Sequence, residues 1–211
     1  MKLYYFPLST YSQKVLIALY EKGIEFTPEI VELGTPEKRA AYRKMYPLGK
    51  VPLLVRDDGW FIPESSIIVE YLDTQLDRGP RLIPEDRELA RRTRFFDRHF
   101  DLYVNEPALT IFFDGRKPEA ERNPAAVAAA RERLDTVYTM LDKHFEKGPW
   151  AVGEAFTLAD CSAAPALAMA RMMHPFDKHA NLTRYLGRLV ERPSFARVLT
   201  EAKPYVAKLM G

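Results

Sequence analysis

The sequence predicts an α/β domain followed by an all-α domain. Short β-rich runs alternate with helical patterns between residues 2 and 76. The segment Asp77-Arg78-Gly79-Pro80-Arg81 then interrupts this alternation and is typical of a linker. No strand pattern follows it, and the rest of the chain shows only helical periodicity. A length of 211 residues is compatible with one or two domains, and the change of pattern favours two.

The first domain begins with a strand, a helix and a second strand. Lys2–Phe6 is a short aromatic-rich run of the kind found in buried strands. Apolar residues then recur at helical spacing as far as Lys22-Gly23, which provides a basic last turn and a glycine stop. Alternation over Phe26–Leu33 predicts the second strand. Because a helix joins these two strands, we expect them to be parallel.

Two helices and a hairpin complete this domain, giving the order β-α-β-α-β-β-α. Thr35-Pro36 has the cap and first-position proline of a helix start. Asp58-Gly59 is a strong two-residue hairpin signal. The flanking strands are Val51–Val55 and Trp60–Ile62, and the last helix is capped by Ser65 or Ser66 and runs through Leu72.

The remaining chain is expected to form helices over residues 87–112, 124–147, 158–173, 182–191 and 194–201. Thr157-Leu158-Ala159-Asp160 has the form of a capping box, so Thr157 and Asp160 receive a structural role. Cys161 is expected to be an inert packing residue. The domains are therefore placed at residues 1–77 and 87–211, with a linker over residues 78–86.

Composition excludes several classes of protein. Apolar residues make up 47% and charged residues 28%, as in ordinary globular chains. With 31 Lys and Arg against 29 Asp and Glu, bulk charge does not favour nucleic acid or a membrane surface. Neither a secretory signal nor a long apolar run is visible. The one cysteine forbids an internal disulfide, and the four histidines lack metal-ligand spacing. We expect a cytoplasmic protein without a metal.

Five motifs, in order, carry a resemblance to a known family: the serine-bearing start Ser9-Thr10-Tyr11-Ser12-Gln13-Lys14-Val15, Pro47-Leu48-Gly49-Lys50-Val51-Pro52-Leu53, Glu64-Ser65-Ser66, Phe156-Thr157-Leu158-Ala159-Asp160 and Glu191-Arg192-Pro193-Ser194-Phe195. Together with the element order, they resemble a cytosolic glutathione transferase of the serine type, similar to theta, zeta and bacterial members. The resemblance implies a thioredoxin-like first domain, glutathione as co-substrate, a detoxifying transferase activity and a homodimer.

The resemblance assigns catalysis to Ser9, with Ser12 and Tyr11 as second choices. These residues lie where the first strand ends and a helix begins, so unpaired N–H groups and a partial positive charge are expected beside them. A bound thiol, with a free pKa near ~8.5, would lose its proton more readily there. The alternative is that Ser9, Thr10 and Ser12 are only helix caps.

Glutathione is expected to bind along two further motifs. Val51-Pro52 is similar to the family's cis-proline turn, whose backbone pairs with the extended peptide of glutathione. Lys50 would meet the glycyl carboxylate, and Glu64 with Ser65 would hold the ammonium and carboxylate of the γ-glutamyl end. The alternatives are a plain loop proline, a solvated lysine and an ordinary helix cap.

The second substrate is expected between the domains, in a pocket lined from the first helical pair and the chain's end. Aromatic residues and methionines make adaptable apolar walls. The candidates are Tyr103, Phe112, Phe113, Met172, Met173 and His174. For each of these residues, the alternative is that its side chain belongs to the ordinary core of the helical bundle.

The expected reaction is attack of the glutathione thiolate on a small, hydrophobic electrophile. The start motif lacks a cysteine, so disulfide exchange through the protein is not expected. Ser9-Thr10-Tyr11 also departs from the Ser-Ser-Cys run of zeta isomerases. The alternatives are a non-catalytic binding protein on the same fold, such as the stringent-starvation-protein type or an elongation-factor subunit, and a glutathione-dependent isomerase or dehalogenase.

Overall fold

The computed structural model describes the backbone of residues 1–32, 34–76 and 78–210 and the side chains of these residues as far as 207. Contacts within the chain divide it into two compact units. One unit comprises Met1–Leu82 and Pro193–Gly211, and the other comprises Ile83–Arg192.

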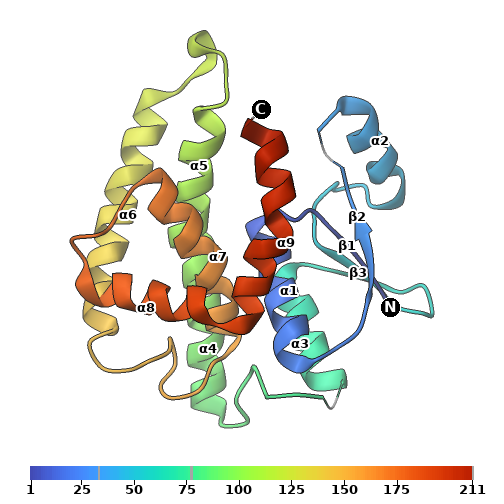
Figure 1. Cartoon of the computed structure of the whole chain (residues 1–211), viewed down its shortest axis with the longest axis horizontal. Coiled ribbons are helices and arrows are strands. Elements are labelled where there is room, and N and C mark those ends of the chain that lie inside the picture. The colour runs from blue at the N-terminus through green and yellow to red at the C-terminus, as the bar shows by residue number, and fades with distance from the viewer. Residues whose placement is uncertain (33, 77, 211) are drawn as a thin grey trace. The chain divides into compact units, whose positions relative to one another are not determined.

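The first unit contains a four-stranded mixed sheet in the order β2-β1-β3-β4 (Figure 1). The parallel pairing of β1 with β2 and the β3–β4 hairpin confirm the expected topology. β2 is shorter than expected, and Leu33, the expected end of that strand, lies outside the described residues. The strands are β1 (Lys2–Tyr5), β2 (Thr27–Ile30), β3 (Leu53–Val55) and β4 (Phe61–Pro63).

The register brings three chain segments to one edge of the sheet. Tyr4, near the end of β1, lies opposite Leu53, the first residue of β3. Leu53 in turn lies opposite Pro63, the last residue of β4. The segments that follow β1, precede β3 and follow β4 therefore meet at the same edge. This edge carries the candidate site.

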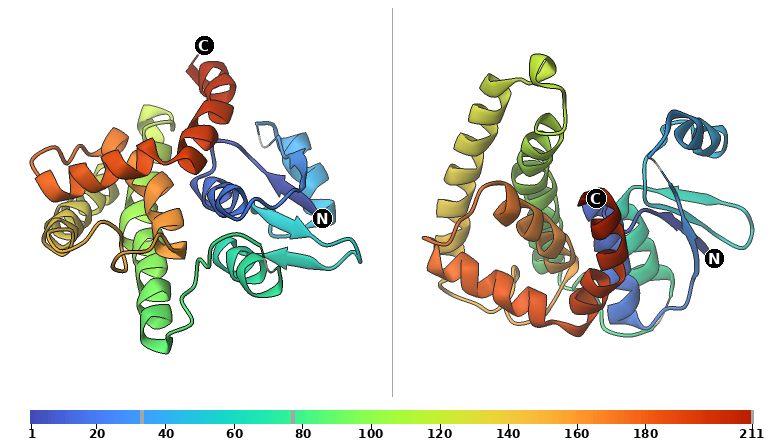
Figure 2. Two further views of the ribbon diagram at one scale, coloured as in Figure 1. Left: turned by 60° about the horizontal axis from the view of Figure 1, so that its bottom comes forward. Right: turned by 45° about the horizontal axis from the view of Figure 1, so that its top comes forward.

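Helices α1 (Thr10–Lys22) and α3 (Ser65–Gln75) pack together against the sheet. Their apolar faces form the core of this unit, where Leu3, Leu16 and Ile68 are at most 2% exposed. Helix α2 (Pro36–Met45) lies away from this pair (Figure 2) and buries only Tyr42 among its residues.

The C-terminal helix α9 (Pro193–Met210) packs on α1, within the unit that contains the sheet. The sequence predicts one helical domain over residues 87–211, whereas contacts group residues 193–211 with the sheet. Polar contacts account for the different grouping: the Tyr20 hydroxyl donates to Glu201 over 2.5 Å, and the Ser194 hydroxyl donates to Glu21 over 2.5 Å. Phe195, which is 1% exposed, adds apolar contact at the start of α9.

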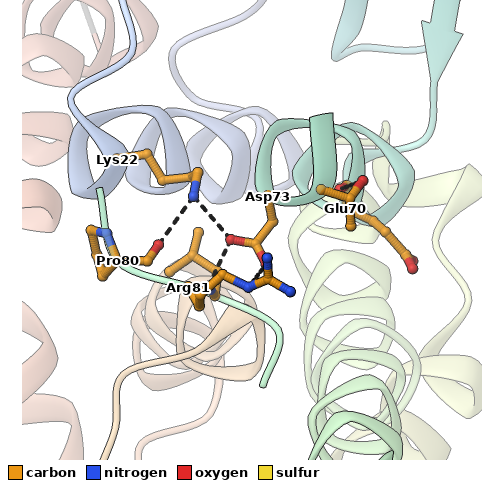
Figure 3. A network of polar contacts seen from close by, with 7 residues as sticks. Lys22, Glu70, Asp73, Pro80 and Arg81 are labelled. Atoms are coloured by element: carbon orange, nitrogen blue, oxygen red, sulfur yellow. Dashed lines mark hydrogen bonds and ion pairs between the residues drawn. The ribbon is translucent and has the colours of Figure 1, made fainter. Parts of the chain in front are cut away.

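A buried ion pair fixes the segment after α3 to the end of α1 (Figure 3). Lys22 Nζ lies 3.0 Å from Asp73 Oδ1 and donates to the Pro80 carbonyl over 3.1 Å. Asp73 also accepts the Leu82 amide over 2.8 Å. Removing one partner of a buried ion pair costs about 3–5 kcal/mol, so this network anchors the segment firmly. The expected domain boundary at residue 77 lies outside the described residues.

The second unit is helical throughout its regular structure (Figure 2). The helix expected over residues 87–112 contains a π-helical turn instead of continuing as α-helix. Pro107 provides a physical reason, because it lacks an N–H group and its ring disturbs the preceding turn. The elements are α4 (Arg87–His99), η1 (Phe100–Asn105), α5 (Glu106–Asp114), η2 (Glu119–Glu121), α6 (Pro124–His144), α7 (Leu158–Met173) and α8 (Ala180–Glu191).

Asp160 organises the start of α7, as its assigned structural role requires. Its Oδ2 accepts the Thr157 amide over 2.8 Å and the Thr157 hydroxyl over 3.1 Å. Its Oδ1 accepts the Ala151 amide over 2.8 Å and the Tyr185 hydroxyl over 2.6 Å. Burial raises the pKa of Asp160, while the hydrogen bonds from Tyr185, Ala151 and Thr157 oppose that rise. The carboxylate therefore joins α7 to α8 as well as capping α7.

None of the helices in the described part of the chain is long and apolar enough to cross a membrane.

Candidate active site

Ser9 caps α1 at the edge of the sheet where β1 ends. Its backbone is extended, and its Oγ accepts the Ser12 amide over 3.3 Å. The Ser9 side chain is half-buried, and its O–H has no acceptor among the described residues. A serine hydroxyl has one donor as well as two acceptor lone pairs. Ser9 can therefore cap the helix and donate a hydrogen bond to a ligand at the same time.

Ser12, the second choice for catalysis, is in a different environment. Its side chain is fully buried, and its Oγ accepts the Phe6 amide over 3.3 Å. Thr10 is also buried at 5% exposure. Tyr11 is half-buried and has a partner within the protein. Of the hydroxyls in this turn, that of Ser9 best combines exposure with an unused donor.

Buried polar side chains that the sequence analysis did not single out hold this turn and the next one in place. Gln13 Nε2 donates to the Pro7 carbonyl over 2.8 Å. Lys14 is 1% exposed, and its Nζ donates to Ser66 Oγ over 2.8 Å at the start of α3. Gln13 and Lys14 are polar residues, so hydropathy alone predicts that their side chains are exposed to solvent. The only signal in the sequence that marks this position is the serine-bearing motif that contains them.

The second segment at this edge is the turn before β3. The Val51–Pro52 peptide bond is cis, as the resemblance implied. The Tyr42 hydroxyl donates to the Lys50 carbonyl over 2.9 Å and so fixes the turn from α2. The amide and carbonyl of Val51 have no partner among the described residues. They are available to pair with an extended peptide, while the Lys50 side chain is exposed beside them.

The third segment contains a strained residue. Glu64 has φ 67° and ψ 117° and is the one residue other than glycine with positive φ in the described chain. It occupies the N-cap of α3 without forming a side-chain cap, so the expected cap at Ser65 or Ser66 is wrong. Ser65 is instead the first helical residue, 6% exposed. Strain of this kind costs about 1–3 kcal/mol and is concentrated at functional sites.

The carboxylate of Glu64 is exposed and has no ion-pair partner among the described residues. Burial raises the pKa of Tyr46, and the negative charge of Glu64 raises it further. The carboxylate is thus close enough to Tyr46 to influence its ionisation. The unpaired acid beside the free N–H groups of α3 suits a ligand that carries both an ammonium and a carboxylate.

The residues expected to line the second-substrate pocket do not form one cluster within the helical unit. Their rings instead make separate contacts. The Phe112 and Phe113 rings lie 5.2 Å apart, and Tyr103 contacts His99 at 5.2 Å. His174 stacks near Tyr138 at 6.0 Å. No ring contact joins these groups across the described part of the unit. Phe113 is 59% and Met172 68% exposed, whereas Met173 is half-buried.

Among the described residues, no group of three or more His, Cys, Asp or Glu side chains is placed to hold a metal ion.

Comparison with known proteins gives consistent matches across both units. Residues 3–80 match the family description "Glutathione S-transferase, N-terminal domain", and residues 124–188 match "Glutathione S-transferase, C-terminal domain". A curated glutathione S-transferase from Pseudomonas putida is 29% identical over 220 residues, covering 100% of this chain and 96% of the relative.

A solved glutathione S-transferase from Methylobacillus flagellatus with GSH bound has a TM-score of 0.84 and 30% identity, covering 93% of this chain and 98% of that one. Elongation factor 1-gamma-A from Xenopus laevis is 30% identical over 95% of this chain, which spans 47% of that relative. The domain matches, the full-length relatives and the mixed-sheet-plus-helices fold agree. This chain belongs to the cytosolic glutathione S-transferase family.

Proposed function

We propose that this chain is a glutathione transferase that activates the glutathione thiol through Ser9. The observation that carries this proposal is the position of the half-buried Ser9 side chain. Its Oγ caps α1, and its O–H group has no acceptor among the described residues. The same sheet edge carries the unpaired backbone of Val51 and the strained Glu64. A thiol, an extended peptide backbone and a γ-glutamyl end each have a complementary group there.

Ser9 would lower the pKa of the bound thiol. A free thiol with a pKa near ~8.5 is only a few per cent thiolate at neutral pH. A hydrogen bond to a charged group contributes about 1.5–3 kcal/mol, and a helix N-terminus contributes about 0.3–1 kcal/mol. Together they correspond to a lowering of roughly 1.3 to 3 pKa units, which brings the pKa of the thiol close to neutral pH or below it.

The rest of glutathione would lie along the edge. Its cysteinyl backbone would pair with the amide and carbonyl of Val51 as an added strand. Its γ-glutamyl ammonium would meet the Glu64 carboxylate, and its γ-glutamyl carboxylate would accept from Ser65 and the first amides of α3. The glycyl carboxylate would meet Lys50, whose side chain is exposed.

The second substrate would be a small, hydrophobic electrophile. The exposed Tyr103, Phe113 and Met172 are apolar groups that such a substrate could contact, as the sequence suggested. The thiolate sulfur forms the new bond to the electrophilic carbon, and the electrons of the bond that breaks leave with the displaced group or pass into the conjugated acceptor. No protein cysteine takes part.

Two measurements test this proposal. Calorimetry should detect binding of glutathione at millimolar concentration or below. A panel of aryl halides, epoxides and conjugated carbonyl compounds, scored by loss of free thiol, should identify at least one substrate class whose reaction the protein accelerates. A protein that does not bind millimolar glutathione would contradict the proposal at its first step.

The similarity to elongation factor 1-gamma-A favours one second candidate, a binding protein on the same fold. Such a protein has no need of an unpaired donor at Ser9 or of a strained residue at position 64. Retention on immobilised glutathione with elution by free glutathione would favour the transferase. Binding without conjugation would instead favour a glutathione-dependent isomerase or dehalogenase.

We also propose a homodimer in which the sheet-containing unit of one copy contacts the helical unit of the other. The support is a set of large apolar side chains exposed on both units. Light scattering should give twice the 24.3 kDa mass of the chain, and a species of 24.3 kDa alone would contradict this proposal. The exposed side chains are Trp60 (68%), Phe61 (39%) and Ile67 (53%) on one unit and Phe95 (57%) on the other.

A further inference from the structure

We propose that Lys14 is a positioning residue that makes activation of the thiol depend on the γ-glutamyl group of the substrate. Lys14 does so by fixing the distance between two segments, which we call the thiol turn (Pro7–Ser9) and the γ-glutamyl turn (Glu64–Ser66). This role rests on the proposed function, in which Ser9 receives the thiol and Glu64 with Ser65 receives the γ-glutamyl end. It defines the class of thiol that the site accepts as γ-glutamyl thiols.

Lys14 is a charged side chain in the interior of the sheet-containing unit. It is 1% exposed, and its Nζ donates to Ser66 Oγ over 2.8 Å. Ser66 lies on α3, so the bond joins two helices through residues that are 52 positions apart in the sequence. An ammonium group is costly to bury without hydrogen-bond acceptors, so the fold retains this bond. Lys14 therefore fixes the start of α3 against α1.

The bond from Lys14 reaches the γ-glutamyl turn itself. Ser66 is the second residue of α3, after Ser65 and the N-cap residue Glu64. Glu64 has the strained φ of 67°, and its carbonyl accepts the Ile68 amide over 2.9 Å. A strained backbone persists only where the surrounding contacts hold it. The hydrogen bond from Lys14 is one of the contacts that hold this turn.

Gln13, the residue before Lys14, holds the thiol turn in the same way. Gln13 is 9% exposed, and its Nε2 donates to the Pro7 carbonyl over 2.8 Å. Its backbone amide donates to the Ser9 carbonyl over 2.9 Å. Because Gln13 and Lys14 are consecutive residues of one α-helix, the spacing between their backbone atoms is fixed. Their two side-chain bonds therefore set the position of the thiol turn relative to the γ-glutamyl turn.

The pair of helices α1 and α3 has a polar clamp near each end. Lys22 lies 3.0 Å from Asp73 near the C-terminal ends of the two helices (Figure 3), and Lys14 bonds Ser66 near their starts. Apolar side chains such as Leu16, which is 2% exposed, pack between the clamps. Only the clamp at the starts adjoins the candidate site. Loss of the bond to Ser66 should therefore alter the site and leave the helices packed together.

A γ-glutamyl thiol is sensitive to this spacing because its two ends are joined covalently. When its γ-glutamyl group is held at Glu64 and Ser65, the position of its sulfur relative to Ser9 depends on the distance between the two turns. Hydrogen bonds weaken when their geometry is poor, and a misplacement of about 1 Å can cost about 10²-fold in rate. A thiol without the γ-glutamyl group makes no contact with the γ-glutamyl turn and gains nothing from the spacing. Lys14 thus favours γ-glutamyl thiols over other thiols.

Ser66→Ala is the variant that tests this role, because it removes the acceptor and keeps the charge of Lys14. Glutathione is compared with N-acetylcysteinylglycine, in which an acetyl group replaces the γ-glutamyl group. Each thiol reacts with 1-chloro-2,4-dinitrobenzene: the thiolate sulfur forms a bond to the aryl carbon, and chloride leaves with the electrons of the broken bond. The unaltered protein should prefer glutathione about tenfold or more. Ser66→Ala should lower kcat/KM about tenfold for glutathione and less than about twofold for N-acetylcysteinylglycine.

The pKa of the bound glutathione thiol is a second readout and needs no electrophile. Followed by the ultraviolet absorbance of thiolate, it should rise by about 0.5 unit or more in Ser66→Ala, because the sulfur lies less well against Ser9. Ser66→Thr retains a hydroxyl acceptor and should preserve both the selectivity and the thiol pKa. Thr74→Ala is the matched control, since the Thr74 hydroxyl donates to the Glu70 carbonyl over 2.8 Å within α3. It should change neither readout.

Lys14→Met removes the donor of the same bond and should lower the preference for glutathione as Ser66→Ala does. The double variant should lower it no further, because both substitutions remove one interaction. Ser66→Ala decides the question by itself where Lys14→Met does not fold.

Equal losses for the two thiols in Ser66→Ala would overturn the proposal, because general damage to the site affects both. An unshifted thiol pKa in Ser66→Ala, or an equal shift in Thr74→Ala, would also overturn it. These results differ from failure of the proposed function. A thiol pKa that does not move in Ser9→Ala contradicts the function of Ser9, whereas a shift in Ser9→Ala without one in Ser66→Ala contradicts the role of Lys14 alone.

Discussion

The Ser12 amide donates to Ser9 Oγ over 3.3 Å, so the two serines of the start motif are joined within one turn of α1. Ser9 is the acceptor in this bond, which leaves its hydroxyl proton for a second partner. Ser12 is fully buried, and its own Oγ accepts the Phe6 amide. The two residues carry the same chemical group, yet only Ser9 presents it where a ligand can approach.

Glu64 is predicted to lower the stability of the fold while it strengthens the binding of glutathione. Because its φ of 67° is strained for any residue but glycine, Glu64→Gly should raise the free energy of unfolding by about 0.5–2 kcal/mol. The same substitution should weaken glutathione binding by about 1.5–3 kcal/mol, since a charged group loses its partner. Chemical denaturation and calorimetry measure the two effects.

Glu64→Ala is the control for this prediction, because it removes the carboxylate and keeps the strain. Its affinity for glutathione should fall as in Glu64→Gly, while its stability should not rise. If the alanine and glycine variants are equally stable, the strain assigned to Glu64 does not exist.

Gly79 is predicted to be essential for the contact between the segment after α3 and α1. Its φ is +65°, and a Cβ there would lie 2.5 Å from the Lys22 Cα. Gly79→Ala should therefore lower the free energy of unfolding by about 2–5 kcal/mol, from the left-handed backbone and the clash together. Gly23 has a similar φ of +60° with open space around it, so Gly23→Ala should cost only about 1–2 kcal/mol. Equal losses in the two variants would contradict the close approach.

Asp160 is predicted to contribute more than a helix cap. A lost cap typically costs ~1 kcal/mol, which was all that the capping motif implied. The structure adds donors from Ala151 and Tyr185, which Asp160→Ala would leave buried and unpaired. The free energy of unfolding should therefore fall by about 3–5 kcal/mol, whereas Tyr185→Phe should cost about 1 kcal/mol. Denaturation curves of the two variants that coincide would argue against this role.

His99 and His144 predict a loss of stability in mild acid. Burial lowers the pKa of each imidazole below its ordinary value, and in His99 the neighbouring His144 lowers the pKa further. Below a pH of about 6.5 the unfolded chain therefore binds protons that the folded chain does not. Stability should fall as the pH drops from about 7 toward 5.

His144→Gln tests this assignment, because it removes one of the two groups. The melting temperature of the variant should fall less between pH 7 and 5.5 than that of the unaltered protein, whatever its value at pH 7. An identical slope over this range would show that His144 does not titrate as described.

The fold could be predicted from the sequence wherever local signals agreed. The Asp58-Gly59 hairpin and the parallel β1–β2 pair followed from turn chemistry and from strand–helix–strand connectivity. The grouping of α9 with the sheet could not be predicted in this way. It depends on contacts between residues far apart in sequence, such as Tyr20 with Glu201, which no local pattern records. The π-helical turn at Phe100–Asn105 could not be predicted either, because a single such turn changes the spacing of apolar residues too little to be recognised in the sequence.

The candidate site was predictable only through its motifs. Ser9, Val51 and Glu64 were singled out because their motifs occur in order, and the structure places them at one sheet edge. The burial of Lys14 and the strain at Glu64 were not predictable. A charged residue in a helix is ordinarily solvated, and the sign of φ at a residue other than glycine is set by tertiary contacts.

The proposed role of the Ser9 hydroxyl is to stabilise the glutathione thiolate. The absorbance of thiolate in the ultraviolet, followed as the protein–glutathione complex is titrated, gives the pKa of the bound thiol directly. Ser9→Ala should raise this pKa by about 1–2 units, equivalent to roughly 1.4–2.7 kcal/mol. Turnover at pH 7 should fall about tenfold or more and recover partly at higher pH, while glutathione affinity changes little.

Ser12→Ala and Tyr11→Phe are the matched variants for this titration. Ser12→Ala removes a hydroxyl from the same turn but from the buried bond to Phe6, so it should lower stability by about 1 kcal/mol without moving the thiol pKa. We expect that, of these three variants, Ser9→Ala alone shifts the pKa of the bound thiol. An unshifted pKa in Ser9→Ala, with a shift in Ser12→Ala or Tyr11→Phe, would contradict it.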